Sequence, residues 1–179
     1  MIPLSISHHV REDDRITESA LFSGYQREPW FKPRFHMPVE TIRLAGKCRV
    51  VVAGAYHSAV FALAQGIPAV GIVKSLEYRN KFHGLRDEFG CGCEIVSLES
   101  RDFEFDLGQA IDRLWQNAEE LRPQLLKAAE SQIELATEGY ERLRAVVSGS
   151  RATIPSASAH AAETRPGACS SGGRQEISS

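Results

Sequence analysis

The chain has 179 residues, of which 42% are hydrophobic and 25% are charged, a composition typical of a globular protein. Its net charge of −2 and isoelectric point near 6.3 argue against a nucleic-acid partner. No stretch approaches 18 continuous apolar residues, which argues against a membrane span. The N-terminus lacks the pattern of a signal peptide, and the four cysteines lack paired zinc spacing. We therefore expect a cytoplasmic protein with reduced thiols and no bound metal.

The N-terminal part of the chain predicts a strand and two short helices. Residues 2–7 have the pattern of a strand, and a weakly helical segment ends at Phe22. Residues 24–38 form a loop that is rich in proline and in aromatic residues. Residues 39–46 then predict a short helix that a glycine closes.

The middle of the chain predicts a complete strand, loop, helix and strand unit. Residues 49–53 and 69–73 are short apolar runs, typical of strands that are buried on both faces. Between them lies a predicted helix over residues 59–65, with Ser58 as its N-cap and Gly66 as its stop signal.

The loop of this unit carries the best candidate site. Gly54 allows a sharp turn after the first strand, and a parallel arrangement places that turn at the carboxyl edge of the sheet, where open α/β folds bind ligands. His57 lies in the loop beside a helix N-terminus, whose N–H groups and dipole favour an anion. We therefore expect His57 to contact an anionic ligand, although a loop histidine satisfied by backbone groups is the alternative.

The C-terminal part predicts mostly helix. A polar loop over residues 74–80 leads to a helix over residues 81–89, and residues 94–98 predict a fourth strand. From Asp106, which forms a possible capping box with Gln109, a long helix begins that Pro123 should kink or divide. Apolar residues recur along it at intervals of three and four: Leu107, Ile111, Leu114, Ala118, Leu121, Leu125, Ile133, Ala136, Tyr140, Leu143 and Val147.

Together these elements predict an α/β fold, with a Rossmann-like parallel sheet and flanking helices over residues 1–147, ending in a long kinked helix. Residues 148–179 are rich in Ser, Ala and Gly and predict a disordered tail. We expect Trp115 to lie in the core. Four strands are few for a doubly wound domain, so we expect the second half of a larger two-domain protein, from a split gene, a truncated reading frame or a partial product.

Residues 54–68, GAYHSAVFALAQGIP, resemble the signature of the polysaccharide pyruvyl transferase family. In that family an Arg-Leu-His or Ser-Tyr-His elbow precedes an alanine-rich helix and a Gly-x-Pro segment. Further along, Tyr78-x-x-Lys81, Gly84 and Phe89-Gly90 are also similar to the family, as is the long helix around Trp115. The resemblance spans residues 2–147 and covers the C-terminal half of the family.

The resemblance implies two facing Rossmann-like domains of the GT-B type, of which this chain is the donor-side half. It implies transfer of a pyruvyl group from phosphoenolpyruvate, without a cofactor, to a sugar of a cell-surface polysaccharide or a lipid-linked acceptor. His57 matches the elbow histidine, which contacts the donor and acts as an acid or hydrogen-bond donor. Lys81 matches the lysine that pairs with the anionic groups of the donor.

The expected substrate-binding residues are Gly54, Tyr56, Ser58, Tyr78, Lys81 and His8. His8 is included because it follows the predicted first strand and so points toward the same edge of a parallel sheet. The alternative for Lys81 is a solvated surface lysine, and the alternative for Tyr78 is a packing residue. Ala55 stands where many family members have arginine, so a bidentate anion clamp is missing at this position. The candidates to compensate for it are Arg34, Arg43, Arg49 and Lys74.

Two other functions remain open at this point. A GT-B glycosyltransferase could hold the diphosphate of a nucleotide sugar at the same helix start, but residues 59–65 contain no acid to bind a ribose. A truncated, non-catalytic relic would explain Ala55. If the face toward a second domain is exposed, we also expect aggregation or a homo-oligomer.

Overall fold

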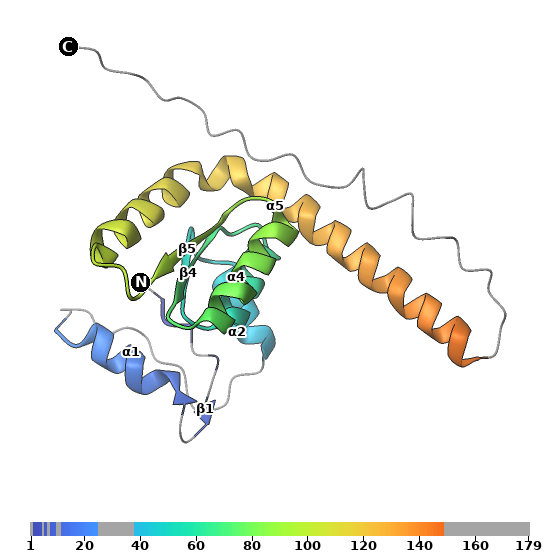
Figure 1. Ribbon diagram of the computed structural model, residues 1–179, viewed down its shortest axis with the longest axis horizontal. Coiled ribbons are helices and arrows are strands. Elements are labelled where there is room, and N and C mark those ends of the chain that lie inside the picture. The colour runs from blue at the N-terminus through green and yellow to red at the C-terminus, as the bar shows by residue number, and fades with distance from the viewer. Residues whose placement is uncertain (1, 5, 7, 10–11, 25–37, 149–179) are drawn as a thin grey trace, which may run out of the picture.

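Three short parallel strands form the sheet at the centre of the molecule, β3 (Val51–Ala53), β4 (Ala69–Val73) and β5 (Cys93–Ser97), in the order β3-β4-β5 (Figure 1). The structure, a computed structural model, describes residues 2–4, 6, 8–9, 12–24 and 38–148. Val51 pairs with Ala69, which in turn pairs with Cys93. The strands are apolar because helices cover both faces of the sheet.

One face of the sheet is covered by α3 (Tyr56–Leu63) and α4 (Leu76–Phe89), which contact each other. Each helix connects two neighbouring strands. Phe82 of α4 is fully buried and lies so close to Gly71 of β4 that a Cβ at this glycine would overlap its ring. The absence of a side chain at Gly71 therefore sets how closely α4 approaches the sheet.

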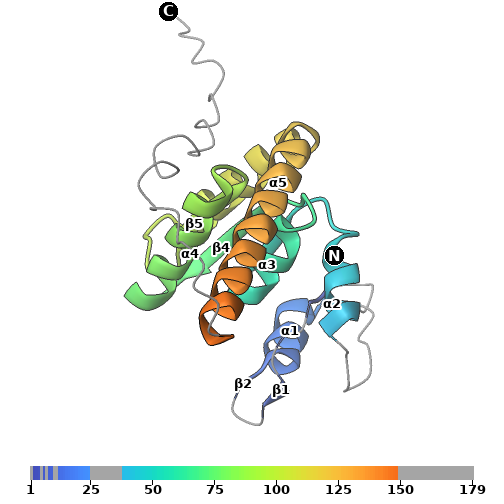
Figure 2. The ribbon, with the colours of Figure 1, turned by 90° about the vertical axis from the view of Figure 1, so that its right-hand side faces the viewer.

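The long helix α5 (Phe103–Val147) starts on the opposite face and then crosses the amino edge of the sheet (Figures 1 and 2). On that face Arg113 pairs with Glu94 of β5. At the amino edge, a Cβ at Gly92 would lie 2.9 Å from Leu125 Cδ1, and one at Gly66 would lie 2.9 Å from Arg122 Cγ. Both glycines have positive φ and precede strands, so they let α5 close this edge.

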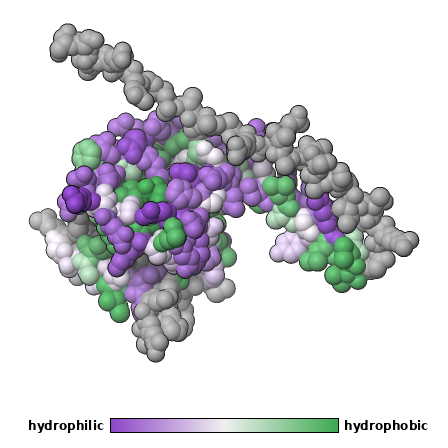
Figure 3. Space-filling model, in the orientation of Figure 1, coloured by the Kyte–Doolittle hydropathy of each residue, from purple (hydrophilic) through white to green (hydrophobic). Residues whose placement is uncertain are grey.

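Beyond the amino edge, α5 continues away from the sheet (Figure 1). Most of the surface around the sheet is hydrophilic in the view of Figure 3, whereas apolar residues gather at the far end of the helix. α5 is one continuous helix that contains Pro123, and Figure 1 shows it changing direction in its yellow part. Of the two alternatives predicted for this proline, the structure therefore shows the kink within one helix and not the division into two.

The N-terminal elements add no strand to the parallel sheet, although α2 (Pro38–Ala45) packs against α3. β1 (His8–His9) and β2 (Glu12–Asp13) form an antiparallel pair, which is followed by α1 (Asp14–Phe22) and α2. Among residues 2–4 and 6 there is no strand, so the predicted first strand is wrong. An apolar run becomes a strand only where a neighbour supplies a hydrogen-bond ladder. Here Leu4 packs against the core without one.

Two helices begin earlier than the sequence pattern predicted. Ser58 is not an N-cap, because α3 starts at Tyr56 and its N-cap is Ala55. α4 starts within the predicted polar loop, because the Ser75 side chain accepts a hydrogen bond from the Tyr78 N–H at 3.3 Å. An exposed polar turn of a helix has no apolar periodicity, so its composition was mistaken for that of a loop.

The start of α5 and the position of Trp115 also differ from prediction. The helix begins at Phe103, so Asp106 lies inside it and accepts a hydrogen bond from Ser100 Oγ at 2.7 Å instead of forming a capping box. Trp115 is 53% exposed and not in the core. Its ring lies 5.3 Å from the Arg49 guanidinium, a cation–π contact at the surface. The predicted disordered tail lies outside the described residues, apart from Ser148, and so does most of the predicted aromatic loop.

Candidate functional site

A very short loop joins β3 to α3 at the carboxyl edge of the sheet. It consists of Gly54 and Ala55, after which the helix begins at Tyr56. Ala55 is the N-cap, with an extended backbone, and no side chain caps this end of the helix. The first N–H groups of α3 thus lack a side-chain partner, and together with the helix dipole they favour an anion.

His57 lies in the first turn of α3 and is exposed. Its ring centroid is 5.7 Å from that of Tyr56, in a T-shaped arrangement, and 6.3 Å from that of Phe61. No hydrogen bond or ion pair joins the His57 side chain to another residue in the described part of the chain. Backbone groups therefore do not satisfy this imidazole, which is open to a ligand.

Tyr56 links the elbow, residues 54–58, to α4. Its half-buried ring meets the buried ring of Phe82 edge to face, with 6.0 Å between centroids. Burial raises the pKa of the Tyr56 hydroxyl, and the negative charge of Glu88 raises it further. The hydroxyl thus stays protonated at neutral pH and can donate a hydrogen bond.

The first turns of α4 present Tyr78 and Lys81 at the surface. Lys81 Nζ lies 2.6 Å from Glu77 Oε1 and 5.0 Å from the centroid of the Tyr78 ring. The hydrogen bond between Lys81 and Glu77 raises the pKa of the lysine and lowers that of the glutamate. Lys81 is charged but already paired, so an incoming anion must compete with Glu77 for it.

The structure brings only part of the predicted site together. Gly54, Tyr56 and His57 form the elbow, and Tyr56 is in contact with α4, the helix that carries Tyr78 and Lys81. Ser58 is buried inside α3, so its side chain does not face the loop. The expectation that His8 follows a strand of the parallel sheet is wrong, because this residue lies in the separate β1-β2 pair.

The residues proposed to replace the missing arginine are at different places. Arg49 lies at the amino edge, where Nε donates to the Trp115 carbonyl and Nη1 pairs with Glu119, each at 3.0 Å. It is therefore not available at the elbow. Lys74 is exposed directly after β4 and so lies at the carboxyl edge. Arg43 is exposed on α2, and Arg34 lies outside the described residues.

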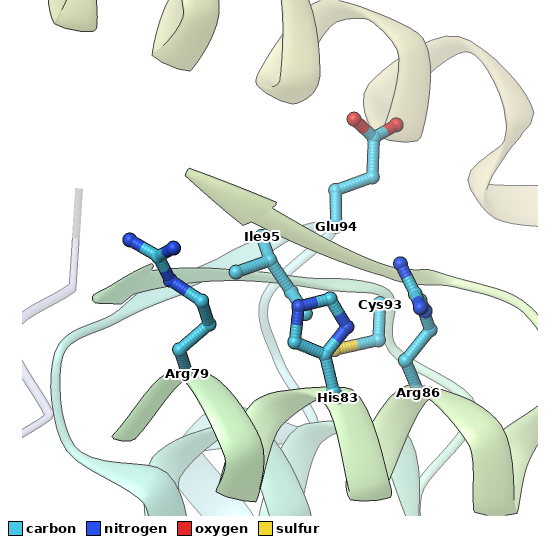
Figure 4. A pocket seen from close by; sticks show the side chains of 6 residues that line it. All are labelled: Arg79, His83, Arg86, Cys93, Glu94 and Ile95. Atoms are coloured by element: carbon cyan, nitrogen blue, oxygen red, sulfur yellow. The ribbon is translucent and has the colours of Figure 1, made fainter. Parts of the chain in front are cut away.

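A basic pocket between α4 and β5 was not predicted (Figure 4). Arg79, His83 and Arg86 point from α4 toward the strand, where they line a volume of about 480 Å³ with Cys93, Glu94 and Ile95. Their spacing of four and three places them on one face of a helix. That signal was present in the sequence but was hidden by starting the helix at residue 81. The pocket contains none of the elbow residues.

Two further classes of site are absent from the described part of the chain. No three His, Cys, Asp or Glu side chains there come together in a way that would hold a metal ion. None of the helices there is long and apolar enough to cross a membrane.

The family model for polysaccharide pyruvyl transferases matches residues 1–75. No curated protein and no solved structure matches the chain. The matched segment includes the elbow with β3, α3 and β4, and it ends just before α4, so Tyr78 and Lys81 lie outside it. The match supports the family resemblance drawn from the sequence: residues 1–75 are similar to the polysaccharide pyruvyl transferase family, a family of transferases.

Proposed function

We propose that this chain, whose first 75 residues match the model of that family, is the donor-side half of a pyruvyl transferase. It would move a pyruvyl group from phosphoenolpyruvate to a sugar hydroxyl of a cell-surface polysaccharide. The observation that carries the proposal is the exposed His57 in the uncapped first turn of α3, whose side chain makes no hydrogen bond or ion pair within the described residues. An imidazole beside an anion-friendly helix start suits a small acidic donor.

The chemistry asks for one proton and one leaving group. His57, in its imidazolium form, donates a proton to the methylene carbon of the enol, which leaves an oxocarbenium-like carbon beside the carboxylate. One sugar hydroxyl adds to this carbon, and a second hydroxyl displaces phosphate, which closes a cyclic ketal. Each hydroxyl loses its proton to a base or to the departing phosphate, so the atoms and charges balance.

The anionic groups of the donor need fixed positive partners. The N–H groups of the first turn of α3 supply a partial positive charge, and Lys74 supplies a full charge at the same edge of the sheet. Lys81 would exchange Glu77 for the phosphate or carboxylate of the donor, since their ion pair is exposed. Tyr78, which is also exposed, offers an aromatic face to the sugar.

In this proposal, the site that binds the acceptor sugar is not on the domain that contains this sheet. A facing second domain, as in GT-B-type folds, would bind the polysaccharide or lipid-linked sugar and would enclose the donor. The reaction would take place in the cytoplasm. It would use phosphoenolpyruvate as the donor substrate and would need no cofactor.

The test is ligand-observed NMR of the full chain with phosphoenolpyruvate and, separately, with a nucleotide sugar. We expect phosphoenolpyruvate to bind and His57→Ala to weaken binding about tenfold or more, since a hydrogen bond to a charged group is lost. His83→Ala, which removes a histidine from α4 away from the elbow, is the matched control and should bind like the unmodified chain.

Either of two results would contradict the proposal. Binding of the nucleotide sugar alone would assign the chain to the glycosyltransferases. Binding of phosphoenolpyruvate that His83→Ala weakens and His57→Ala does not would move the donor site to the basic pocket between α4 and β5.

A further inference from the structure

The last part of α5 projects beyond the sheet (Figure 1), and apolar residues gather at its far end (Figure 3). The exposed apolar side chains of this part form a stripe. Ile133, Tyr140, Leu143 and Val147 are each more than half exposed, up to 78% at Val147. These are the residues that the sequence pattern assigned to the buried face of a long helix. An exposed helix of this kind gains little stability from its own hydrogen bonds, so a partner on its apolar face is expected.

The stripe has the spacing of a coiled coil. Ile133, Ala136, Tyr140, Leu143 and Val147 follow one another at intervals of three, four, three and four, which is the a/d pattern of a heptad repeat. The segment over residues 131–147 is about 25 Å long at the rise of an α-helix. The pattern therefore favours another helix as the occupant, in preference to a sheet or an extended peptide.

Two unpaired charges flank the stripe on the same side. Glu130 and Arg144 both occupy the position that follows a d residue, and both are exposed. Within the described residues, neither side chain makes an ion pair. They carry opposite charges at opposite ends of the segment. A second copy of the helix running antiparallel would bring Glu130 of each copy beside Arg144 of the other, in two equivalent pairs.

The sizes of the apolar side chains agree with the same alignment. In an antiparallel pair centred at Glu138, Ile133 of one copy faces Leu143 of the other, and the small Ala136 faces the large Tyr140. Gly139 lies next to this level, and a Cβ there would have no neighbour within 4 Å. A glycine inside an exposed helix is unfavourable by about 1 kcal/mol relative to alanine, and nothing within one copy compensates for it. A glycine at position 139 would leave space for the Tyr140 ring of the second copy, which is a physical reason for its presence in the helix.

We propose that two copies of this chain associate through residues 130–147 of α5 as an antiparallel two-stranded coiled coil. A parallel pair would place Tyr140 against Tyr140 and Ala136 against Ala136, and it would leave Glu130 and Arg144 far apart. The antiparallel pair fills each large position with a small one and neutralises all four charges. It is also isologous, as expected for a closed dimer.

The first test is sedimentation equilibrium of the full chain and two variants. We expect the unmodified chain to be dimeric and Leu143→Asp to be monomeric, because the change places a charge in the apolar seam. Leu135→Asp is the matched control, since Leu135 is 62% exposed on the same helix but lies outside the seam, and it should remain dimeric. Circular dichroism confirms that both variants keep their helices. A monomeric unmodified chain, or loss of the dimer in both variants, would overturn the proposal.

The second test addresses the antiparallel direction. Glu130→Arg alone and Arg144→Glu alone should each weaken the dimer, because each places like charges together. An equimolar mixture of the two variants should restore it, since position 130 of each chain then meets an opposite charge at position 144 of the other. If the two variants together dimerise no better than either alone, the antiparallel register is wrong.

Discussion

In the proposed donor site, Ala55 limits how the elbow could hold an anion. It is the N-cap of α3, with an extended backbone, and it offers only backbone groups at the position where the family resemblance led us to expect an arginine. Because α3 begins at the next residue, a longer side chain at position 55 would lie beside the open N–H groups and His57. The missing charge is therefore a local deficit, at a point where the backbone already favours anions.

Ala55→Arg should tighten the binding of phosphoenolpyruvate about tenfold, because a guanidinium can donate two hydrogen bonds to a carboxylate or phosphate. A titration followed by NMR or calorimetry measures this change. Ala64→Arg adds the same charge at the C-cap, the opposite end of α3, and should leave the affinity unchanged. Equal gains from both substitutions would mean that net charge, and not the elbow, controls binding.

At the scale of single elements, one side chain, that of Ser75, caps the N-terminus of α4. The Ser75 hydroxyl accepts a hydrogen bond from the Tyr78 N–H, and the following turn carries Glu77 and Lys81 as an ion pair one turn apart. The residues proposed to contact the donor on α4 are thus held by the first turns of the helix.

Ser75→Ala should lower the free energy of unfolding by about 1 kcal/mol, the usual effect of losing an N-cap. Urea denaturation followed by circular dichroism measures it. Ser131→Ala, at an exposed position inside α5, removes the same hydroxyl without removing a cap and should change stability by about 0.5 kcal/mol or less. A Ser75→Ala variant as stable as this control would show that the cap contributes nothing.

The elements that the sequence predicted best are those with a buried apolar pattern. The strand over residues 69–73 was predicted with its observed bounds, because strands buried on both faces are continuous apolar runs. Of α4, only residues 81–89 were predicted to be helical, and these contain its buried residues Phe82, Leu85 and Phe89. Where burial does not select the residues, as before residue 81, the sequence carried a weaker signal.

For the site, the sequence located the loop but not the contacts within it. The order of strand, glycine and helix was enough to predict that His57 lies at the carboxyl edge. Arg49 is held at the amino edge of the sheet by α5, whose Glu119 lies 70 residues away in sequence. Contacts at such separations depend on the tertiary path of the chain, which local patterns do not describe.

At the scale of the whole molecule, the two edges of the sheet differ. α5 closes the amino edge with Leu125, which is fully buried and packs against Gly92. The carboxyl edge holds the short Gly54–Ala55 loop with the exposed His57. The part of the core that α5 completes therefore lies at the edge of the sheet opposite the proposed donor site.

Leu125→Ala should destabilise the protein by about 2–5 kcal/mol, because it leaves a cavity beneath the glycines of the amino edge. Leu126→Ala, at the next residue, should cost about 1 kcal/mol or less, since Leu126 is 37% exposed. Chemical denaturation gives both values. Binding of phosphoenolpyruvate to the folded fraction should be the same in both variants. Similar stabilities for the two would mean that α5 does not close the core at this edge.

The spatial order of the strands follows their order in the chain, and this has a consequence for synthesis. As the polypeptide leaves the ribosome, β4 can pair with β3, and β5 can then pair with β4. α5 emerges last, and Leu125 lies 28 residues after the end of β5 at Ser97. Until that segment has been translated, the nascent sheet exposes one apolar face and its amino edge. This is the interval in which the chain is most open to aggregation and to capture by a chaperone.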